Sequence, residues 1–385
     1  MANSGLQFQL SRYSGSDTDR DLPISIQDWK TLAREKLDDK AWWYIEGGAG
    51  SNDTCTANEE RFQHYRLRPR YMRNVENSSI EITVLGRKRS SPFIIAPLGA
   101  MSIINQDADL LGAEAAEYLD IVFCQSTVSS NSIEDVARHA PKAEKWFQLY
   151  PGKDKMIMKS FIQRAEKAGF KAIVVTVDTT MLGWRESDLK NSYLPFLQGH
   201  GMANYLTDTY FRKRLRDDPQ NDLSGAIMEW LKIYVNPAFD WQYFDEIRSW
   251  TNLPVLIKGI SGLADVREAF EHKANGVIIS NHGGRQVDGA VATIDALYEI
   301  TQSGSYEGDL LIDSGIRHAA DVMRAFCLGA SGVLIGRPYA YAMAAAGARG
   351  VKRLLEELKG ELSLQLALSG FNGLGELSSN DLLRL

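Results

Sequence analysis

Eight short apolar runs rich in β-branched residues recur along the chain, and amphipathic segments of helical period separate most of them. The runs lie at 92–97, 121–125, 145–149, 172–177, 254–258, 276–280, 309–313 and 332–336. Continuous apolar strands that alternate with helices indicate a parallel sheet covered on both faces. Eight such units over about 250 residues predict an α/β fold, a (β/α)8 TIM barrel, with an open doubly wound sheet as the alternative.

Three stretches fall outside this alternation. Residues 1–22 are polar and rich in Ser and Asp, which predicts a flexible leader, with a single barrel domain over 23–385. Residues 26–47 have a helical pattern and short extended pieces follow, so we expect this N-terminal segment to cover one barrel mouth. About 75 residues separate the fourth and fifth runs, so residues from about 186 to 250 are expected to form a partly mobile active-site lid.

Charge and composition exclude several classes of protein. The net charge is -6 and there is no long basic run, which argues against a nucleic-acid partner. No window approaches 18 uninterrupted apolar residues, so we expect no membrane span. The three cysteines, Cys55, Cys124 and Cys327, lack metal-type spacing and predict free thiols rather than disulfides or a metal site. Together these features predict a cytoplasmic protein.

The most informative motif is Ser-Asn-His-Gly-Gly-Arg-Gln, residues 280–286, which directly follows the sixth apolar run. The C-terminal ends of barrel strands are where the side chains that act on substrates converge. His282 is a proton acceptor near neutral pH, and Arg285 carries a planar group that pairs with carboxylates. A base beside a carboxylate-binding group indicates an enzyme that takes a proton from a small organic acid.

The other strand ends suggest a cofactor. Several of them carry amide, hydroxyl or ammonium groups, which suit the polar edge of a large heteroaromatic ring. The last two add Asp313-Ser314-Gly315-Ile316-Arg317 and Gly336-Arg337, where barrels commonly bind a phosphate. A ring, a phosphate and the nearby Lys258 together predict flavin mononucleotide (FMN).

Some of the candidate residues also have a structural interpretation. Asp178 is at a position where it could cap the next helix. Tyr44 and Tyr150 could be half-buried packing residues, and Arg185 could form a surface ion pair. The remaining histidines, His200 among them, show no metal-type spacing and are interpreted as structural.

From about Ile24 to its C-terminus, the chain resembles the FMN-dependent L-2-hydroxy acid oxidising family, which includes glycolate oxidase, lactate oxidase, lactate monooxygenase and mandelate dehydrogenase. The resemblance rests on the 280–286 motif together with Trp-Phe-Gln-Leu-Tyr (146–150), Thr-Val-Asp-Thr (176–179), Leu-Gly-Trp-Arg-Glu (182–186), Leu-Ile-Lys-Gly-Ile (256–260) and Ile-Gly-Arg-Pro (335–338).

The resemblance implies a role for each matching residue. His282 would be the catalytic base with Asp178 as its partner, and Tyr150 would bond the substrate hydroxyl. Arg185, Arg285 and Tyr44 would bind the substrate carboxylate. FMN would be held by Pro97, Leu98, Gly99, Ser126, Gln148, Thr176, Lys258, Ser280, Asp313, Gly315, Arg317, Gly336 and Arg337. A homotetramer or homo-octamer is implied as well.

Two features resemble the lactate 2-monooxygenase subgroup. The first strand ends Ala96-Pro97-Leu98-Gly99, without the methyl group that many family oxidases place at the last position, and the insertion is long. The expected reaction is therefore oxidation of an L-2-hydroxy acid, L-lactate in the first place, by O2, coupled to decarboxylation that gives acetate, CO2 and water. The alternatives are an oxidase that releases the 2-keto acid and H2O2, and a non-catalytic flavin-binding scaffold. Thr180, Met181 and Ser314 depart from the family pattern.

Overall fold

The computed structural model describes residues 3–385 and contains a closed barrel of eight parallel strands, as predicted. The barrel order is β10-β11-β4-β5-β6-β7-β8-β9. Its strands are β4 (Phe93–Ile95), β5 (Val122–Gln125), β6 (Glu144–Leu149), β7 (Ala172–Thr176), β8 (Val255–Ile260), β9 (Gly276–Ile279), β10 (Asp309–Ile312) and β11 (Gly332–Ile335). Each predicted apolar run contains or overlaps one of these strands.

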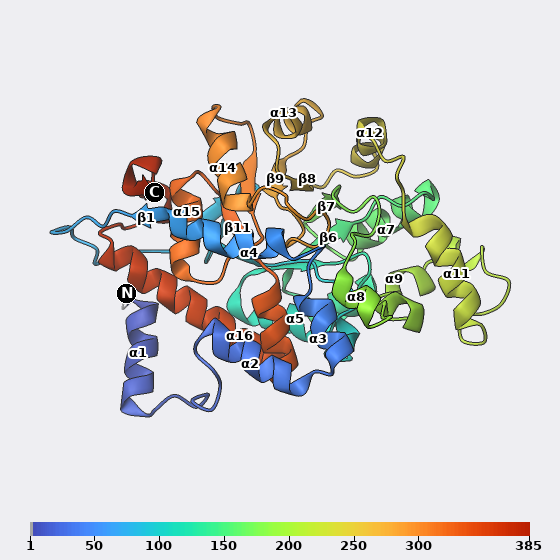
Figure 1. The fold of residues 1–385 in the computed structure, drawn as a ribbon, viewed down its shortest axis with the longest axis horizontal. Coiled ribbons are helices and arrows are strands. Elements are labelled where there is room, and N and C mark those ends of the chain that lie inside the picture. The colour runs from blue at the N-terminus through green and yellow to red at the C-terminus, as the bar shows by residue number, and fades with distance from the viewer. Residues whose placement is uncertain (1–2) are drawn as a thin grey trace.

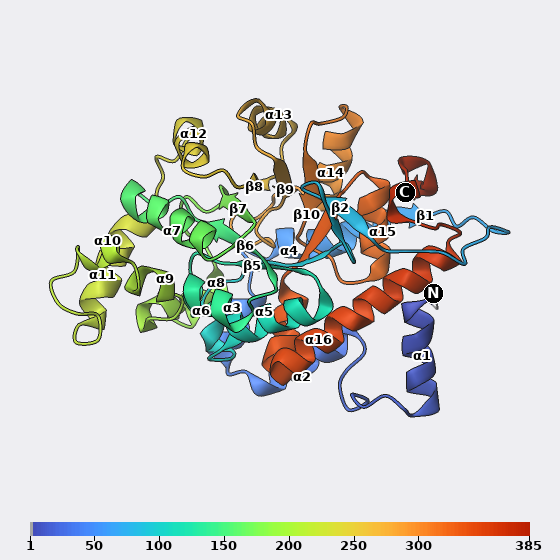
Figure 2. The ribbon, with the colours of Figure 1, turned by 180° about the vertical axis from the view of Figure 1, so that it is seen from behind.

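Helices cover the outside of the barrel; all but the last of them connect consecutive barrel strands, and the last follows β11 (Figures 1 and 2). They are α5 (Ala108–Leu119), α6 (Ile133–His139), α7 (Lys155–Lys167), α12 (Trp241–Ser249), α13 (Leu263–Glu271), α14 (Thr293–Gln302), α15 (Ala319–Cys327) and α16 (Arg337–Leu368), the last with a kink at Ala346 and Gly347. Several start with a side-chain cap, as when Ser132 accepts a hydrogen bond from the Asp135 N–H. Their apolar faces bury against the strands, which supplies most of the driving force for the fold.

The barrel interior forms a separate apolar core with Ile94, Val122, Trp146 and Leu256 among its members. Val84 also belongs to this core and comes from a hairpin of β2 (Ile82–Val84) and β3 (Arg87–Arg89). The Leu85 N–H donates to Asp309, the first residue of β10, so this hairpin covers the N-terminal end of the barrel. The opposite, C-terminal end is therefore the one left for a site.

The segment before the barrel is helical and then extended, as its sequence pattern indicates. It consists of α2 (Ile26–Lys36), α3 (Asp39–Glu46), α4 (Asp53–Glu60), the 3-10 turn η1 (Arg61–His64) and β1 (Tyr65–Leu67). After α16 the chain continues through η4 (Leu374–Glu376) and η5 (Ser379–Asp381) to β12 (Leu382–Arg384), which pairs antiparallel with β1.

The expectation of a flexible leader differs from the structure over residues 3–22. Ser4–Ser14 form helix α1, capped by Asn3, which lies beside α16 in both views (Figures 1 and 2). The two backbones approach closely at Gly5 and Gly360, where a Cβ on Gly5 would lie 2.1 Å from the Gly360 carbonyl oxygen. Arg353 on α16 also binds Asp17 at 2.9 Å. The leader finds a partner more than 300 residues away in the chain, which its own polar composition does not reveal.

The insertion between β7 and α12 is folded and extends to one end of the molecule (Figures 1 and 2). It contains α8 (Glu186–Lys190), η3 (Pro195–Gln198), α9 (Ala203–Leu206), α10 (Thr209–Arg212) and α11 (Leu223–Tyr234). Trp230, Tyr205 and Phe211 are fully buried and give it a small aromatic core of its own. Its mobility as a lid stays a prediction.

Two further expectations concern single features. All three cysteines are free, with Cys124 and Cys327 buried and Cys55 partly exposed. Over residues 3–385, the helices are too short or too polar for any of them to span a bilayer.

Candidate active site

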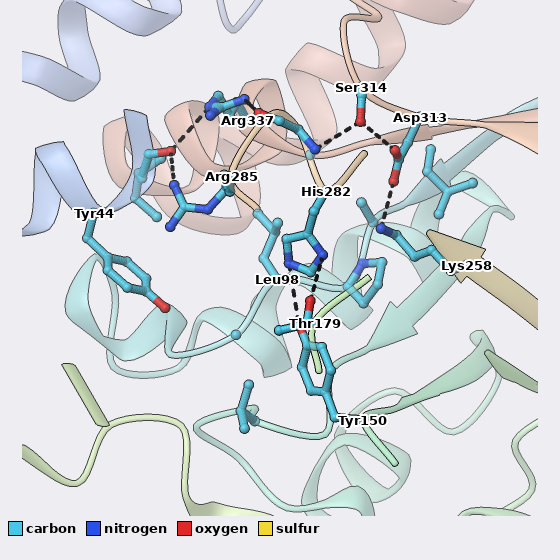
Figure 3. A pocket seen from close by; sticks show the side chains of 18 of the residues that line it. Tyr44, Leu98, Tyr150, Thr179, Lys258, His282, Arg285, Asp313, Ser314 and Arg337 are labelled. Carbon is cyan, nitrogen blue, oxygen red and sulfur yellow. Dashed lines mark hydrogen bonds and ion pairs between the residues drawn. The ribbon is translucent and has the colours of Figure 1, made fainter. Parts of the chain in front are cut away.

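A cavity of about 1060 Å3, open to solvent, lies at the C-terminal ends of the barrel strands (Figure 3). Most of the residues predicted from the sequence line it: Tyr44, Pro97, Leu98, Gly99, Tyr150, Arg185, Lys258, His282, Arg285, Asp313, Gly315, Arg317, Gly336 and Arg337. These side chains come from widely separated parts of the chain, and the barrel closure brings them together.

The other predicted residues lie just behind the cavity wall and are hydrogen-bonded to one another or to residues that line it. Ser126 donates to the Gln148 side-chain oxygen at 3.1 Å, and the Gln148 amide donates to Thr176 at 2.9 Å. This buried row crosses the neighbouring strand ends of β5, β6 and β7. Ser280 accepts a hydrogen bond from Lys258 at 2.8 Å, and Asp178 binds His282.

The loop after β9 holds His282 in an unusual backbone conformation. His282, Gly283 and Gly284 have φ values of 58°, 66° and 74°, all in the left-handed region. A non-glycine residue adopts this region at an energetic cost, and such strain is often found where a side chain must be aimed at a ligand. Here the Gly283 N–H donates to Ser314 at 2.9 Å, while Asn281 exchanges two side-chain hydrogen bonds of 2.8 Å with Asn58. These contacts hold the loop and aim the imidazole into the cavity.

His282 and Asp178 form a hydrogen-bonded pair of 2.8 Å between Nδ1 and Oδ1. The His282 side chain is 19% exposed and that of Asp178 is 10% exposed. Burial lowers the pKa of His282 by more than the Asp178 carboxylate raises it, so the imidazole is neutral at pH 7. Burial raises the pKa of Asp178, but His282 and Lys258 outweigh this effect and keep the pKa below its ordinary value.

The protonation states define what this pair can do. A neutral imidazole that donates Nδ1–H to a carboxylate leaves the lone pair of Nε2 free to accept a proton. That atom faces the cavity, 3.4 Å from the Tyr150 hydroxyl. After proton transfer, the adjacent carboxylate stabilises the imidazolium. The geometry is that of a general base with its orienting partner.

Two residues that the sequence interpretation did not include support this pair. Thr179 donates to Asp178 at 2.8 Å and lies 3.3 Å from His282 Nδ1. Gly259 has a φ of +106°, and a Cβ there would lie 2.6 Å from Cγ of Asp178. Both residues lie within the motifs 176–179 and 256–260, which was the available signal, but their contacts depend on the pairing of strands β7 and β8.

Arg285 lies on the Tyr44 side of His282 (Figure 3). Arg185 lines the same cavity, and the two guanidinium groups are close enough for their charges to interact. Burial and the neighbouring Arg185 charge lower the pKa of Arg285 to about 9. The Arg285 guanidinium lies over the Tyr44 ring, 5.2 Å from its centre, and Asp188 lies 3.6 Å from Arg185. A buried guanidinium group (Arg185) and a half-buried one (Arg285), with one nearby carboxylate, favour the binding of an anion, and a carboxylate matches their planar donors.

The opposite side of the cavity has the polar groups that FMN requires. Lys258 is 3.1 Å from Asp313 and its pKa is raised because Asp313 and Asp178 outweigh the effect of burial. Arg317 and Arg337 line the cavity as well, and Arg337 lies close to Arg285, with which it shares the Ile45 carbonyl as an acceptor. Gly315 has a φ of +107°, and a Cβ would lie 2.0 Å from the Asn58 carbonyl oxygen, so only glycine fits this turn. Cations and free backbone N–H groups at the start of a loop fit a phosphate. The hydrogen-bonded side chains of Ser126, Gln148 and Thr176 fit the polar edge of a ring.

The sequence interpretation missed several other cavity residues. Val128, Leu182, Phe196, Ser314 and Tyr234 line the cavity as well. Ser314, one of the departures from the family pattern, has a φ of 68° and binds both Gly283 and Asp313. Phe196 and Tyr234 come from the insertion, whose folding onto the barrel has no periodic signal in the sequence.

The fold and the site define an α/β-barrel enzyme with a base, a carboxylate-binding region and a place for a phosphorylated ring cofactor. The FMN-dependent dehydrogenase family matches residues 33–384, nearly the whole chain. The chain therefore belongs to this family, is an FMN-dependent 2-hydroxy acid oxidoreductase, and uses FMN as its cofactor, as predicted.

Individual relatives agree with this assignment. The chain is 37% identical over 349 residues to the L-lactate oxidase of Lysinibacillus sphaericus, covering 91% of this chain and 90% of the relative. It is 35% identical over 351 residues to human 2-hydroxyacid oxidase 1, covering 90% and 93%. Among solved structures, an oxidized active mutant of (S)-mandelate dehydrogenase superposes with a TM-score of 0.85 at 31% identity, covering 94% of this chain and 99% of that one.

Proposed function

We propose that this enzyme oxidises a small L-2-hydroxy acid, in the first place L-lactate, with O2 as the electron acceptor. We further propose that it decarboxylates the keto acid product before release. The observation that carries the first part is the His282–Asp178 pair, whose His282 lines the same cavity as Arg185 and Arg285. A base and a carboxylate-binding region in one cavity are what the α-carbon of a hydroxy acid requires.

In this mechanism, Arg185 and Arg285 bind the substrate carboxylate, and the Tyr44 hydroxyl adds a donor. This pairing fixes the α-carbon relative to the base. Nε2 of His282 accepts a proton from the substrate, and Asp178 stabilises the imidazolium that results. Tyr150 stays neutral, because burial raises the pKa of its hydroxyl, and it donates a hydrogen bond to the substrate hydroxyl or to the forming keto oxygen.

FMN, when bound, accepts the two electrons of the oxidation. Lys258, Ser126, Gln148 and Thr176 would hold the polar edges of its ring. Arg317, Arg337 and the turn at Gly315 would hold its phosphate, with Pro97, Leu98, Gly99, Ser280, Asp313 and Gly336 completing the site. Lys258 supplies a buried positive charge that favours a ring carrying negative charge.

The insertion gives the support for coupled decarboxylation. It contributes Leu182, Phe196 and Tyr234 to the cavity lining, which favours a substrate with a short apolar side chain. Phe196 packs edge-on against Tyr44, with 6.5 Å between ring centres, so the insertion reaches across to the carboxylate-binding side. We infer that these insertion residues slow the release of products, and retained pyruvate reacts with H2O2 to give acetate, CO2 and water.

Gly99, which also lines the cavity, gives a second observation in support of coupled decarboxylation. A Cβ at Gly99 would lie 2.5 Å from the Val128 side chain, so the cavity side of this loop has no room for a methyl group unless Val128 moves. The resemblance to the family implies that a missing methyl at this position goes with the lactate 2-monooxygenase subgroup.

The second candidate function is a plain 2-hydroxy acid oxidase. It is favoured by the names of two relatives, L-lactate oxidase and 2-hydroxyacid oxidase 1. Both candidates share the same base and the same carboxylate-binding residues, and they differ only in whether the products leave before they react. The homotetramer or homo-octamer remains a prediction for either candidate, and light scattering of the holoenzyme would check it.

Product analysis separates the two candidates. The FMN-loaded enzyme is turned over aerobically with L-lactate, and acetate, pyruvate and H2O2 are quantified together without catalase. Acetate equal to the lactate consumed, with little free H2O2, is the expected result. Pyruvate and H2O2 in equal amounts, with no acetate, would establish the oxidase instead. Adding pyruvate and H2O2 to heat-inactivated enzyme controls for their reaction in solution.

A further inference from the structure

A Gly-His-Gly turn in the insertion is bonded directly to the barrel loops beside the cavity. Gly199 and Gly201 have φ values of +84° and +76°, which lets the chain reverse sharply around His200. Nδ1 of His200 accepts a hydrogen bond of 2.7 Å from the Ser102 hydroxyl. Burial lowers the pKa of His200, so its ring is neutral at pH 7 and can accept this bond.

Ser102 is itself held by a second serine. Ser130 donates its hydroxyl to Ser102 at 2.8 Å and accepts the Ser102 N–H at 3.1 Å. The Ser130 N–H donates to the buried carboxylate of Asp109 at 2.8 Å. The result is a continuous chain of hydrogen bonds from the insertion through the loop after β4 to the loop after β5. We call His200, Ser102 and Ser130 the latch.

The turn lies against the backbone that carries the cavity residues Gly99 and Val128. The Ala100 N–H donates to the Val128 carbonyl at 2.8 Å, which joins the two loops. A Cβ on Gly201 would lie 2.7 Å from that same carbonyl oxygen and 3.2 Å from the Ala100 nitrogen. Glycine is therefore needed at 201 for the close approach.

The same turn is bonded to the part of the insertion that lines the cavity. The His200 N–H donates to the Pro195 carbonyl at 3.2 Å, and the Gly199 N–H donates to the Phe196 carbonyl at 3.0 Å. The Phe196 ring packs on Trp230 at 5.0 Å between centres and lines the cavity. A displacement of the turn therefore displaces Phe196.

We propose that His200 is a positioning residue whose bond to Ser102 holds Phe196 in its place in the cavity lining. The strength of this bond thereby sets how long the keto acid product stays in the cavity. This inference rests on the proposed function for its meaning, because product retention decides between coupled decarboxylation and release. The latch itself does not touch the reacting atoms, so it changes product partition rather than proton abstraction.

A separate anchor makes the latch testable without loss of the fold. Asn204 is fully buried and donates to the Thr127 carbonyl at 3.0 Å, while its side-chain oxygen accepts the Ile133 N–H at 2.9 Å. These bonds keep the base of the insertion on the barrel when His200 is replaced. The change is therefore expected to stay local to the turn.

The test compares His200→Ala with the wild-type holoenzyme. Loss of one net hydrogen bond shifts the open and closed populations by about fivefold. We expect free H2O2 per lactate to rise about fivefold, the inhibition constant of pyruvate to rise by the same factor, and amide exchange at residues 196–201 to accelerate. The rate of anaerobic FMN reduction by lactate should stay unchanged. His200→Asn, whose side-chain oxygen can accept from Ser102, should restore the wild-type values.

Two further variants complete the design. Ser102→Ala removes the same bond from the barrel side and should reproduce His200→Ala. His139→Ala removes a half-exposed histidine paired with Glu114 on the surface and should change none of these quantities. Unchanged H2O2 yield and unchanged pyruvate inhibition in both latch variants would overturn the proposal. If the wild type already releases all its H2O2, the coupled reaction is refuted, while the pyruvate inhibition constant and the exchange rates still test the latch.

Discussion

Replacing Asp178 with asparagine should lower kcat/KM for L-lactate by about 10³- to 10⁴-fold and leave FMN binding intact. The substitution removes the charge that stabilises the His282 imidazolium, but it keeps the size and most of the shape of the side chain. The asparagine oxygen can still accept the Nδ1–H bond, so the ring need not change its position.

The magnitude follows from the distance between the two groups. Nδ1 of His282 and Oδ1 of Asp178 are 2.8 Å apart. Unit charges at that separation attract by about 6 kcal/mol at an effective dielectric constant of about 20. Both charges are spread over several atoms, so the mean separation is larger and the attraction falls to about 4–5 kcal/mol. At about 1.4 kcal/mol for each factor of ten, this corresponds to the stated loss.

The assay is stopped-flow anaerobic reduction of the flavin by L-lactate, followed at the flavin absorbance, together with steady-state kcat/KM. Asp295→Asn is the matched control, because Asp295 is another partly buried carboxylate that binds Arg61 and Tyr65 on the outside of the barrel. The control should retain its rate. A decrease of less than tenfold in Asp178→Asn, with the flavin fully bound, would refute the role given to the carboxylate.

Four other outcomes follow from the same site. The pKa of His282 is below its ordinary value, and only the neutral ring accepts a proton. We therefore expect kcat/KM to stay constant from pH 8 to 6.5 and to fall only at lower pH. A decline of kcat/KM already at pH 7.5 would contradict this. The folded state then binds this proton less readily than the unfolded chain, so the free energy of unfolding should decrease as the pH drops below about 6.5. Gly259→Ala should lower kcat/KM by about 10²-fold or more, because its Cβ would displace Asp178, and full activity would show that the strand end can relax. Lys258→Met should weaken FMN binding and slow flavin reduction, and a normal flavin content after desalting with a normal reduction rate would remove Lys258 from the cofactor site.

Much of the barrel could be predicted because parallel strands buried on both faces must be apolar along their whole length. The run at 276–280 and the strand β9 (Gly276–Ile279) differ by one residue. Once the strands are located, the barrel geometry requires their C-terminal ends to meet, so His282, Lys258 and Asp178 could be grouped although about 100 residues separate the first from the last.

The roles of the insertion and the leader could not be predicted in the same way. Helix α1 depends on the close approach of Gly5 to Gly360, and Phe196 reaches the cavity only because the insertion packs on the barrel loops. The sequence gives His200 only the interpretation of a structural residue, since it lacks metal-type spacing. Its hydrogen-bonded neighbours Ser102 and Ser130 lie 98 and 70 residues earlier in the chain. Such contacts have no period and no local motif.

The sequence by itself determined the barrel, the strand ends that carry the chemistry, and the family to which the chain belongs, because local pattern and motif spacing encode them. The tertiary structure alone decided the proton state of His282, the presence of the two arginines in one cavity, and the contribution of Phe196 and Tyr234 from the insertion to the cavity lining. Those properties depend on burial and on distances between side chains that are remote in the chain, and electrostatic energies change steeply with both.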